Sequence, residues 1–141
     1  MPQRIPIGMC GNLEEFAMLA PGYDYLEPSV ARTLSPLEGD AAMAERMASL
    51  RALQPPIRAF NIFVPEAVPL TGPAVDWDRV ALYVSRGLAR AATLGARVVV
   101  FGSAAARRVP DGFPYREAWG QLVRFLSICA DHASAENPTI A

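Results

Sequence analysis

The feature of this sequence that most restricts its fold is a regular alternation of apolar, strand-like segments and amphipathic, helical segments. Strands are expected at residues 4–10, 23–27, 57–64 and 97–103, with a fifth beginning at residue 138. Helices are expected between them, at residues 12–20, 41–53, 78–94 and 115–137. Because strands that alternate with helices form a parallel sheet on which the helices pack, the sequence predicts an α/β protein.

Several residues mark where the predicted helices begin, end and face the core. Asn12 and Glu15 form a capping-box-like pair at the start of the first helix, which Gly22 is placed to end. Asp76 is placed to cap the third helix, and Gly95 to end it. The helical periodicity predicts these inward-facing residues: Leu13, Phe16, Ala17 and Ala20; Met43, Met47 and Leu50; Val80, Val84, Leu88 and Ala91; Ala118, Leu122, Phe125, Leu126 and Cys129.

Two architectures fit this alternation in a single domain of 141 residues. One is an open, doubly wound sheet of flavodoxin-like size, and the other is one half of a (βα)8 barrel. Length favours the open sheet, because a complete barrel typically needs about 250 residues. The apolar segment at the end of the chain, Pro138–Ala141, favours the half barrel, because we expect a free-standing domain not to stop three residues into a strand.

Composition excludes some classes of partner. The formal net charge is −1, and all thirteen basic residues are arginines, so no basic surplus is available for nucleic acid. Cys10 and Cys129 lie far apart in no metal-binding spacing, which indicates a reducing compartment without a disulfide framework. No signal peptide is recognised, and no segment approaches the ~20 apolar residues of a membrane span. We therefore expect a cytoplasmic protein.

Polar residues follow the predicted strands at their carboxyl ends, where ligands gather in both architectures. The candidates for contacting a ligand are Cys10, Glu27, Asn61, Ser103 and Arg107. Asn12, Glu66 and Arg108 stand near the same ends, but Asn12 is first of all a helix cap and Arg108 is expected to be solvated. A rim crowded with polar groups at the end of apolar strands predicts a binding site there.

Each candidate has a structural alternative. Glu27 ends a buried strand, so its carboxylate either binds a ligand or pairs with an arginine. Asn61 either contacts substrate or satisfies a neighbouring loop. Ser103 and Arg107 offer a hydroxyl and a planar donor to carboxylate, phosphate or sugar oxygens, or belong to a solvated surface loop. Cys10 lacks a nearby histidine to activate it as a nucleophile.

Several common sites are missing from the sequence. It contains no GxGxxG, P-loop or GxSxG motif, so dinucleotide binding, P-loop chemistry and a nucleophile elbow have no support. The one histidine, His132, lies on the fourth helix and is expected at the surface or in packing. With only Glu27 and Glu66 near strand ends, too few donors converge for a catalytic hard-cation site.

Five segments of the sequence resemble the sugar phosphate isomerase/epimerase family, the xylose isomerase-like TIM barrels, in the order of that family. They are GYDYLEPSV, FNIFVP, LTGPAVDWDRV, LGARVVVFGSAAARRVPDGF and NPTIA, and together they span nearly the whole chain. The resemblance implies that residues 1–141 are one partial barrel domain: the N-terminal half of a (βα)8 barrel, with about four βα units and the start of a fifth strand.

The resemblance also implies a function for the parent enzyme. In that family a divalent cation, Mn²⁺ or Mg²⁺, binds adjacent sugar oxygens, and two carboxylates move a proton beside the carbonyl through an enediolate. The family's metal ligands come from strands five to eight, beyond Ala141, so this chain alone is expected to hold neither metal nor catalytic residues. Glu27, Ser103 and Arg107 remain as the first candidates for contacting a sugar or sugar phosphate, with Cys10 and Asn61 behind them.

Two further expectations follow. The chain alone is expected to be inactive, and its exposed sheet edges are expected to pair in a homo-oligomer. The alternative is a flavodoxin-like module that binds an anionic small molecule through the loop of Ser103 and Arg107 without catalysis. Strand order separates the two, because the half barrel requires sequential order and the open sheet requires a reversal in the middle.

Overall fold

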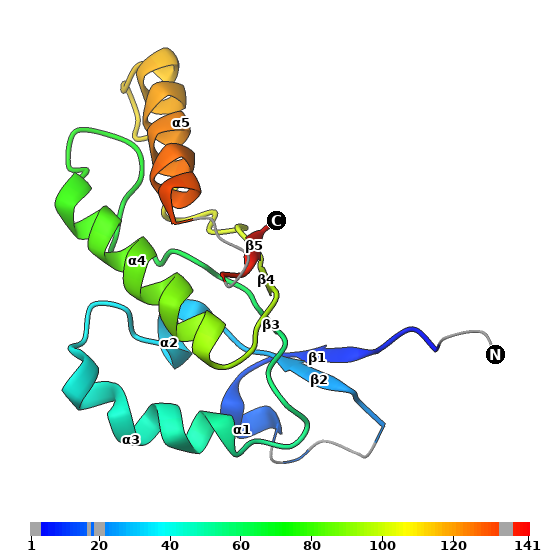
Figure 1. Cartoon of the computed structure of the whole chain (residues 1–141). Coiled ribbons are helices and arrows are strands. Elements are labelled where there is room, and N and C mark those ends of the chain that lie inside the picture. The colour runs from blue at the N-terminus through cyan, green and yellow to red at the C-terminus, as the bar shows by residue number, and fades with distance from the viewer. Residues whose placement is uncertain (1–3, 17, 19–21, 133–136) are drawn as a thin grey trace.

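The structure is a set of short parallel strands that alternate with helices along the chain (Figure 1). This computed structural model describes residues 4–16, 18, 22–132 and 137–141. The strands are β1 (Gly8–Cys10), β2 (Tyr25–Glu27), β3 (Ala59–Phe60), β4 (Val98–Val99) and β5 (Thr139–Ile140). The helices are α1 (Leu13–Phe16), α2 (Val30–Thr33), α3 (Asp40–Arg51), α4 (Trp77–Thr93) and α5 (Tyr115–Asp131). The predicted α/β class is confirmed.

Within the described residues, strands that are neighbours in sequence are also neighbours in space. β1 pairs with β2, and β3, β4 and β5 form a second ladder; all of these pairs are parallel. Two isolated parallel bridges, Leu26 to Ile57 and Ser29 to Asn61, connect β2 to β3. The strand order is therefore sequential, β1 to β5, and does not reverse in the middle.

The strands bury one face much more completely than the other. Figure 1 shows α2, α3, α4 and α5 on one side of β3, β4 and β5. Side chains on alternate faces differ accordingly, because successive residues of a strand point to opposite faces. Phe60 and Val99 are fully buried, whereas Glu27, Val98 and Val100 are only half-buried. We call the less covered side, which carries Glu27 and Val98, the open face.

Aromatic side chains join α4 and α5 to the strand ends. The ring of Phe63 lies 6.2 Å from Tyr83 on α4 and 6.1 Å from Phe125 on α5, between ring centroids. Phe125 also contacts Phe101, at 4.8 Å. The Tyr83 hydroxyl donates a hydrogen bond of 2.8 Å to the Phe63 carbonyl, and burial raises the pKa of this tyrosine. These tilted contacts place both helices against residues that follow β3 and β4.

A buried arginine on α4 organises the connection between α2 and α3. Arg90, with a side chain only 7% exposed, donates to the carbonyl oxygens of Leu34, Ser35 and Glu38 and to the Asp40 carboxylate. The hydrogen bond and charge of Arg90 hold the pKa of Asp40 below its usual range. This contribution to stability is present above the ordinary pKa of an aspartate and is lost as the pH falls through the lowered value.

The three longer helices agree well with the predictions from sequence. α3 buries Met43, Met47 and Leu50, and α4 buries the predicted stripe of Val80, Val84, Leu88 and Ala91. The Asp76 side chain accepts a hydrogen bond of 3.0 Å from the Arg79 N–H, as expected of a cap. Gly95 follows α4 with a φ of 75°. In the described part of the chain, no helix combines the length and apolar character needed to cross a membrane.

The strands differ from the predictions in length and in burial. The predicted segments 4–10, 57–64 and 97–103 contain only two or three strand residues each. Ile62 and Ser103 have φ values of 42° and 35°, which interrupt extended backbone just beyond β3 and β4. The first segment was expected to be buried, but Ile5 and Ile7, which precede β1, are exposed, because no described element covers them. The fourth was expected to be fully buried, yet its open face leaves Val98 half-covered.

Three helical predictions need correction or fall outside the described residues. Leu126 was expected to face inward but is 49% exposed, because no described element covers that side of α5. α2 was not predicted; its cap is Ser29, whose Oγ accepts from the Arg32 N–H at 3.4 Å. The first helix is described only over Leu13–Phe16, and the predicted positions 17, 19 and 20 lie outside the described residues, as do positions 133–136 of the fourth.

Replacing Arg90 by methionine should destabilise the fold by about 3 kcal/mol, because the variant keeps the apolar stem but loses the hydrogen bonds of Arg90 to three carbonyl oxygens and to the Asp40 carboxylate. Urea-induced unfolding followed by circular dichroism measures the change. Arg79→Ala, at an exposed position of the same helix, is the control and should change stability by less than ~0.5 kcal/mol. Equal effects of the two substitutions would contradict the role given to Arg90.

Candidate functional site

Three of the predicted site residues lie together where β1, β2 and β3 end. Cys10 stands opposite Glu27 in the parallel register of β1 and β2. The Asn61 side-chain Nδ2 donates to the Cys10 Sγ at 2.8 Å and to the Glu27 carbonyl oxygen at 3.2 Å. We call Cys10, Glu27 and Asn61 the rim cluster. The structure thus gathers side chains that are up to 51 residues apart in sequence.

The backbone around Asn61 fixes its position in the rim cluster. The Asn61 N–H donates to the Pro28 carbonyl at 3.0 Å, and the Asn61 carbonyl accepts from the Val30 N–H at 2.9 Å. The next residue, Ile62, adopts a positive φ and exposes half of its surface. Asn61 therefore satisfies the neighbouring backbone, which was one of its two predicted roles, while its Oδ1 accepts no hydrogen bond from any described residue and can accept one from a ligand.

The Glu27 carboxylate has no ion-pair partner within the described residues. Ion pairs in that part of the chain join Arg4 to Asp24 and Arg90 to Asp40. The alternative of a structural pair between Glu27 and an arginine is therefore not formed, and Arg107 does not brace Glu27. Because this half-buried carboxylate also accepts no described hydrogen bond, both of its oxygens can accept from the hydroxyl groups of a ligand.

Arg32 lies beside the rim and was not among the predicted site residues. Its Nη1 donates to the Asn12 Oδ1 at 3.2 Å, and its carbonyl accepts from Arg46. The Asn12 N–H in turn donates to the Glu15 carboxylate at 2.6 Å, which is one half of the predicted capping box. The sequence feature that could have indicated Arg32 is Ser29. A serine cap after β2 starts the short helix α2, and α2 places Arg32 beside Asn12.

Ser103 is an internal link between two loops. Its Oγ accepts a hydrogen bond of 2.8 Å from the Val64 N–H, and the residue is only 6% exposed. The loop after β4 is thereby tied to the loop after β3. The hydroxyl can still donate its own proton, so the predicted contact with a ligand stays a prediction. It requires the ligand to reach a residue that is almost fully buried.

Arg107 lies at the surface with part of its guanidinium in use. The Nε donates to the Gly102 carbonyl at 2.7 Å, which holds the side chain over its own loop. Within the described residues its two terminal nitrogens have no acceptor, so they are available to an oxyanion. The neighbouring Arg108 is exposed, as predicted, and contributes its carbonyl oxygen to the Thr71 hydroxyl at 2.6 Å.

The side-chain amide of Gln121 holds the long loop after β3 to helix α5, and no sequence signal pointed to it. Gln121 on α5 accepts from the Gly72 N–H at 2.7 Å and donates to the Gly72 carbonyl at 2.8 Å. Gly72 has a φ of 98°, and a Cβ there would lie 2.7 Å from the Pro110 Cγ. The Leu70 N–H also donates to the Ala106 carbonyl at 2.8 Å. These bonds fix the loop that carries Ser103 and Arg107.

The rim carries few groups that could hold a metal. Among the described residues, no three histidine, cysteine, aspartate or glutamate side chains lie close enough to bind one ion. A hollow of about 430 Å³ lies at the opposite, amino-terminal ends of the strands and is lined by Asp24, Tyr25, Arg58 and Arg97 with their neighbours. None of the residues that line this hollow belongs to the rim cluster.

Comparisons with protein-family models, with curated proteins and with solved structures find no match to this chain. Function is therefore argued from the rim itself, because a fold class alone is compatible with many activities.

Gly72→Ala should destabilise the chain by roughly 2 kcal/mol, because alanine is strained at this positive φ and its Cβ would collide with Pro110. Thermal unfolding measures the change. Gly120→Ala is the matched control: this exposed helical glycine has open space around it, so alanine should raise stability by about 0.5–1 kcal/mol. Destabilisation by both substitutions would refute the specific requirement for glycine at 72.

The two cysteines should differ sharply in reactivity. Cys10 is exposed, whereas Cys129 is buried and burial raises the pKa of its thiol to about 12. We expect the native chain to take up one iodoacetamide group, at Cys10, and the urea-unfolded chain to take up two. Intact mass followed by peptide mapping identifies the sites. Modification of Cys129 at the same rate as Cys10 in the native state would disprove the packing of α5.

Proposed function

We propose that this chain binds a sugar or sugar phosphate at the carboxyl ends of its strands, as the substrate-holding half of a xylose isomerase-like barrel. The activity of the complete site would be sugar isomerisation or epimerisation by proton transfer next to a carbonyl. We place the protein in the cytoplasm with a small-molecule ligand. Its two cysteines are free, its net charge is slightly negative, and it contains no lysine. The resemblance of five segments to that family motivates the proposal, and the architecture supports it.

The strand order supports a half barrel over the flavodoxin-like alternative. Sequential parallel strands with helices on one side are the arrangement of a barrel wall, whose other face points to the barrel interior. A flavodoxin-like sheet needs a reversal in strand order and helices on both faces. The half-covered open face of β2 and β4 fits the first arrangement.

The observation that carries the proposal is the rim cluster. Cys10, Glu27 and Asn61 come from three successive strands and meet at one end of the open face. Their side chains offer a carboxylate, an amide carbonyl and a thiol, and this set accepts hydrogen bonds from adjacent hydroxyl groups. Apolar strands that end in such groups place them where barrel enzymes hold their substrates.

Each polar group has a distinct role in holding a sugar. The carboxylate of Glu27 accepts from two neighbouring hydroxyl groups, and the Oδ1 of Asn61 accepts from a third. The terminal nitrogens of Arg107 donate to a phosphate or to a carbonyl oxygen of the sugar, with the charge-assisted geometry that guanidinium groups provide. Ser103 supports this arrangement by holding the loop.

The described residues do not form a site for the divalent cation that the xylose isomerase-like family uses. The rim cluster supplies one carboxylate, one amide and one thiol, whereas Mn²⁺ and Mg²⁺ prefer several oxygen donors. We therefore assign no metal and no proton-transfer step to this chain. Its part in the reaction is to bind and orient the substrate, and the 141-residue chain should bind without turnover.

Titration with D-fructose 6-phosphate, followed by calorimetry, tests the proposal. We expect Glu27→Gln and Arg107→Ala each to weaken binding about tenfold, because each removes a hydrogen bond to a charged group. Arg108→Ala is the matched control for Arg107 and should leave affinity unchanged. D-Fructose and inorganic phosphate, titrated separately, show how much each half of the ligand contributes.

Two results would contradict the proposal. If inorganic phosphate binds as tightly as the sugar phosphate and Glu27→Gln has no effect, the chain binds an anion and does not bind the sugar. If the purified chain converts fructose 6-phosphate to its epimer in the presence of Mn²⁺, the assignment of binding without turnover is wrong.

A further inference from the structure

Two arginines lie side by side where β3 and β4 begin. The two strands pair in parallel from Ala59 and Val98 onward, and Arg58 and Arg97 directly precede these residues. The Arg97 N–H donates to the Arg58 carbonyl at 2.8 Å, so the backbone fixes the two arginines in register. Neighbouring strands lie about 4.8 Å apart, and residues in register project to the same side of the sheet. We call Arg58 and Arg97 the arginine pair.

Neither member of the arginine pair has a partner for its charge in the described part of the chain. No ion pair and no hydrogen bond from either guanidinium group is formed there, and both side chains are exposed. The buried Arg90 differs, because its guanidinium donates to carbonyl oxygens and pairs with Asp40. Like charges that face each other on neighbouring strands repel and destabilise a sheet. The arginine pair therefore presents unneutralised positive charge and unused donors.

The arginine pair lines a polar hollow of about 560 Å³ beside the end of α4. The other described residues of its lining are Ala92, Gly95, Ala96, Asn137 and Thr139. No acidic side chain is among these described residues, and the exposed hydroxyl of Thr139 adds a further donor. The hollow is suited to a group that brings negative charge and several acceptor oxygens.

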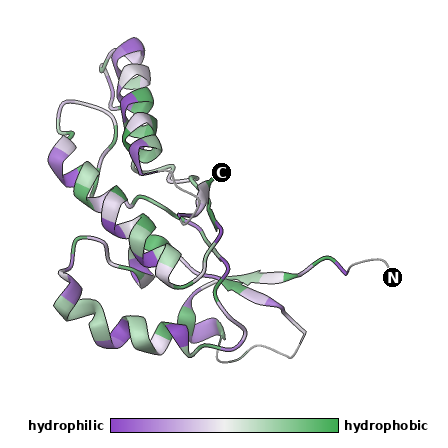
Figure 2. Cartoon of the chain, viewed as in Figure 1, coloured by the Kyte–Doolittle hydropathy of each residue, from purple (hydrophilic) through white to green (hydrophobic). Residues whose placement is uncertain are grey.

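The carboxyl end of α4 helps to place Arg58 but does not neutralise the arginine pair. The helix carries both hydrophobic and hydrophilic residues along its length (Figure 2) and ends at Thr93. A Cβ at Gly95 would lie 3.3 Å from the Arg58 Nη1, so the guanidinium group lies against this glycine. A helix end carries only about half an elementary negative charge, against two positive charges on the arginines. More than one positive charge is left for a ligand to neutralise.

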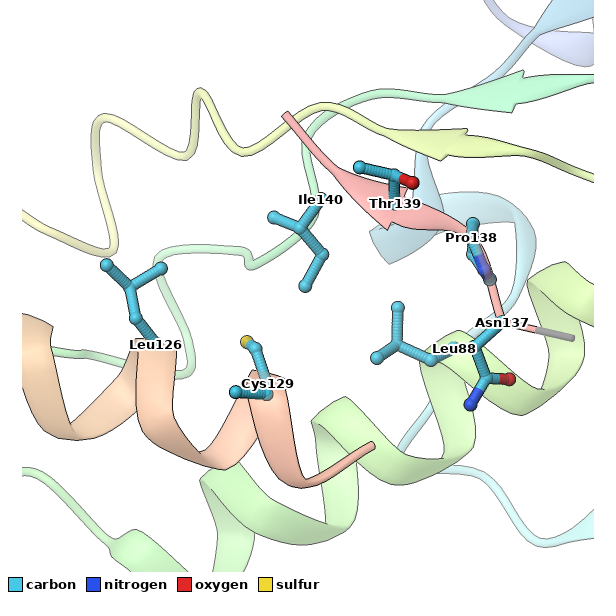
Figure 3. Close-up of a pocket in the computed structure, with 8 residues that line it drawn as sticks. Leu88, Leu126, Cys129, Asn137, Pro138, Thr139 and Ile140 are labelled. Atoms are coloured by element: carbon cyan, nitrogen blue, oxygen red, sulfur yellow. The ribbon is translucent and has the colours of Figure 1, made fainter. Parts of the chain in front are cut away.

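Two neighbouring hollows are less suited to an anion. One lies between α4, α5 and β5, where Leu88, Cys129 and Ile140 point into it (Figure 3). No charged side chain is among its described lining residues. The other is the hollow of about 430 Å³, which also reaches the arginine pair but contains Asp24. The carboxylate of Asp24 would repel an anion, so we assign the ligand to the hollow beside α4.

We propose that the arginine pair binds a phosphate dianion, either as the free ion or as the terminal group of a small metabolite. Guanidinium groups donate paired hydrogen bonds to phosphate oxygens, and one phosphate offers enough oxygens and charge for two arginines. Binding removes the repulsion between the first residues of β3 and β4, so the ligand stabilises the fold. The site lies at the amino-terminal ends of the strands and does not depend on the proposed sugar function.

Calorimetric titration of the Arg107→Ala chain with inorganic phosphate tests the site without a contribution from the rim. We expect one phosphate to bind, and a tenfold excess over the dissociation constant should raise the melting temperature by about 4 °C. In this background Arg58→Gln and Arg97→Gln should each weaken binding about tenfold, because each removes one charged donor. Arg51→Gln, at an exposed position of α3, is the matched control and should leave the affinity unchanged.

Melting temperatures without phosphate give a second measurement. There Arg58→Gln and Arg97→Gln should melt no lower than the parent chain, because each removes the repulsion between the two arginines. Glycerol phosphate, titrated in parallel, binds at least as tightly as inorganic phosphate if the site takes the terminal group of a metabolite, and more weakly if it takes the free ion. Far-ultraviolet circular dichroism verifies that each variant is folded.

Two results would overturn the assignment of a phosphate site. One is a rise in melting temperature no greater than that produced by sodium chloride at the same ionic strength. The other is phosphate binding that both Arg58→Gln and Arg97→Gln leave unchanged, because the ligand would then bind elsewhere on the chain.

Discussion

The fold depends on burying one face of a parallel sheet against helices. Phe60 and Val99, neighbours in β3 and β4, are fully buried, and the aromatic contacts of Phe63 and Phe125 extend the same core to α4 and α5. Burial of this area is the main stabilising contribution available to strands of only two or three residues. The rim cluster lies at one end of the opposite face, which the helices do not cover.

The loops that carry Ser103 and Arg107 are held by hydrogen bonds outside the strands. The Val64 N–H binds Ser103, and Gln121 binds Gly72 through both amide atoms, so the segments after β3 and β4 are held as one unit. Arg107 is positioned by its own loop through Gly102. The positions of Ser103 and Arg107 therefore depend on residues outside the candidate site.

Much of this fold could be predicted because its signals are local. The stripes of α3 and α4, the Asp76 cap and the order of the elements follow from periodicity and capping chemistry within a few residues. The strand lengths could not be predicted, since Ile62 and Ser103 turn the backbone to positive φ although neither is glycine. Leu126 was misplaced for a related reason: periodicity identifies the apolar side of a helix, but not whether another element covers all of it.

For the candidate site, the sequence by itself determined which polar side chains lie at the carboxyl ends of the strands. The end of each apolar segment locates the end of its strand. Only the tertiary structure decided how those side chains are used. It joined Asn61 to Cys10 across β2 and Ser103 to Val64, and among the described residues it paired no arginine with the Glu27 carboxylate. The physical reason is that hydrogen bonds between distant segments depend on strand register and loop geometry, which no local pattern of residues encodes.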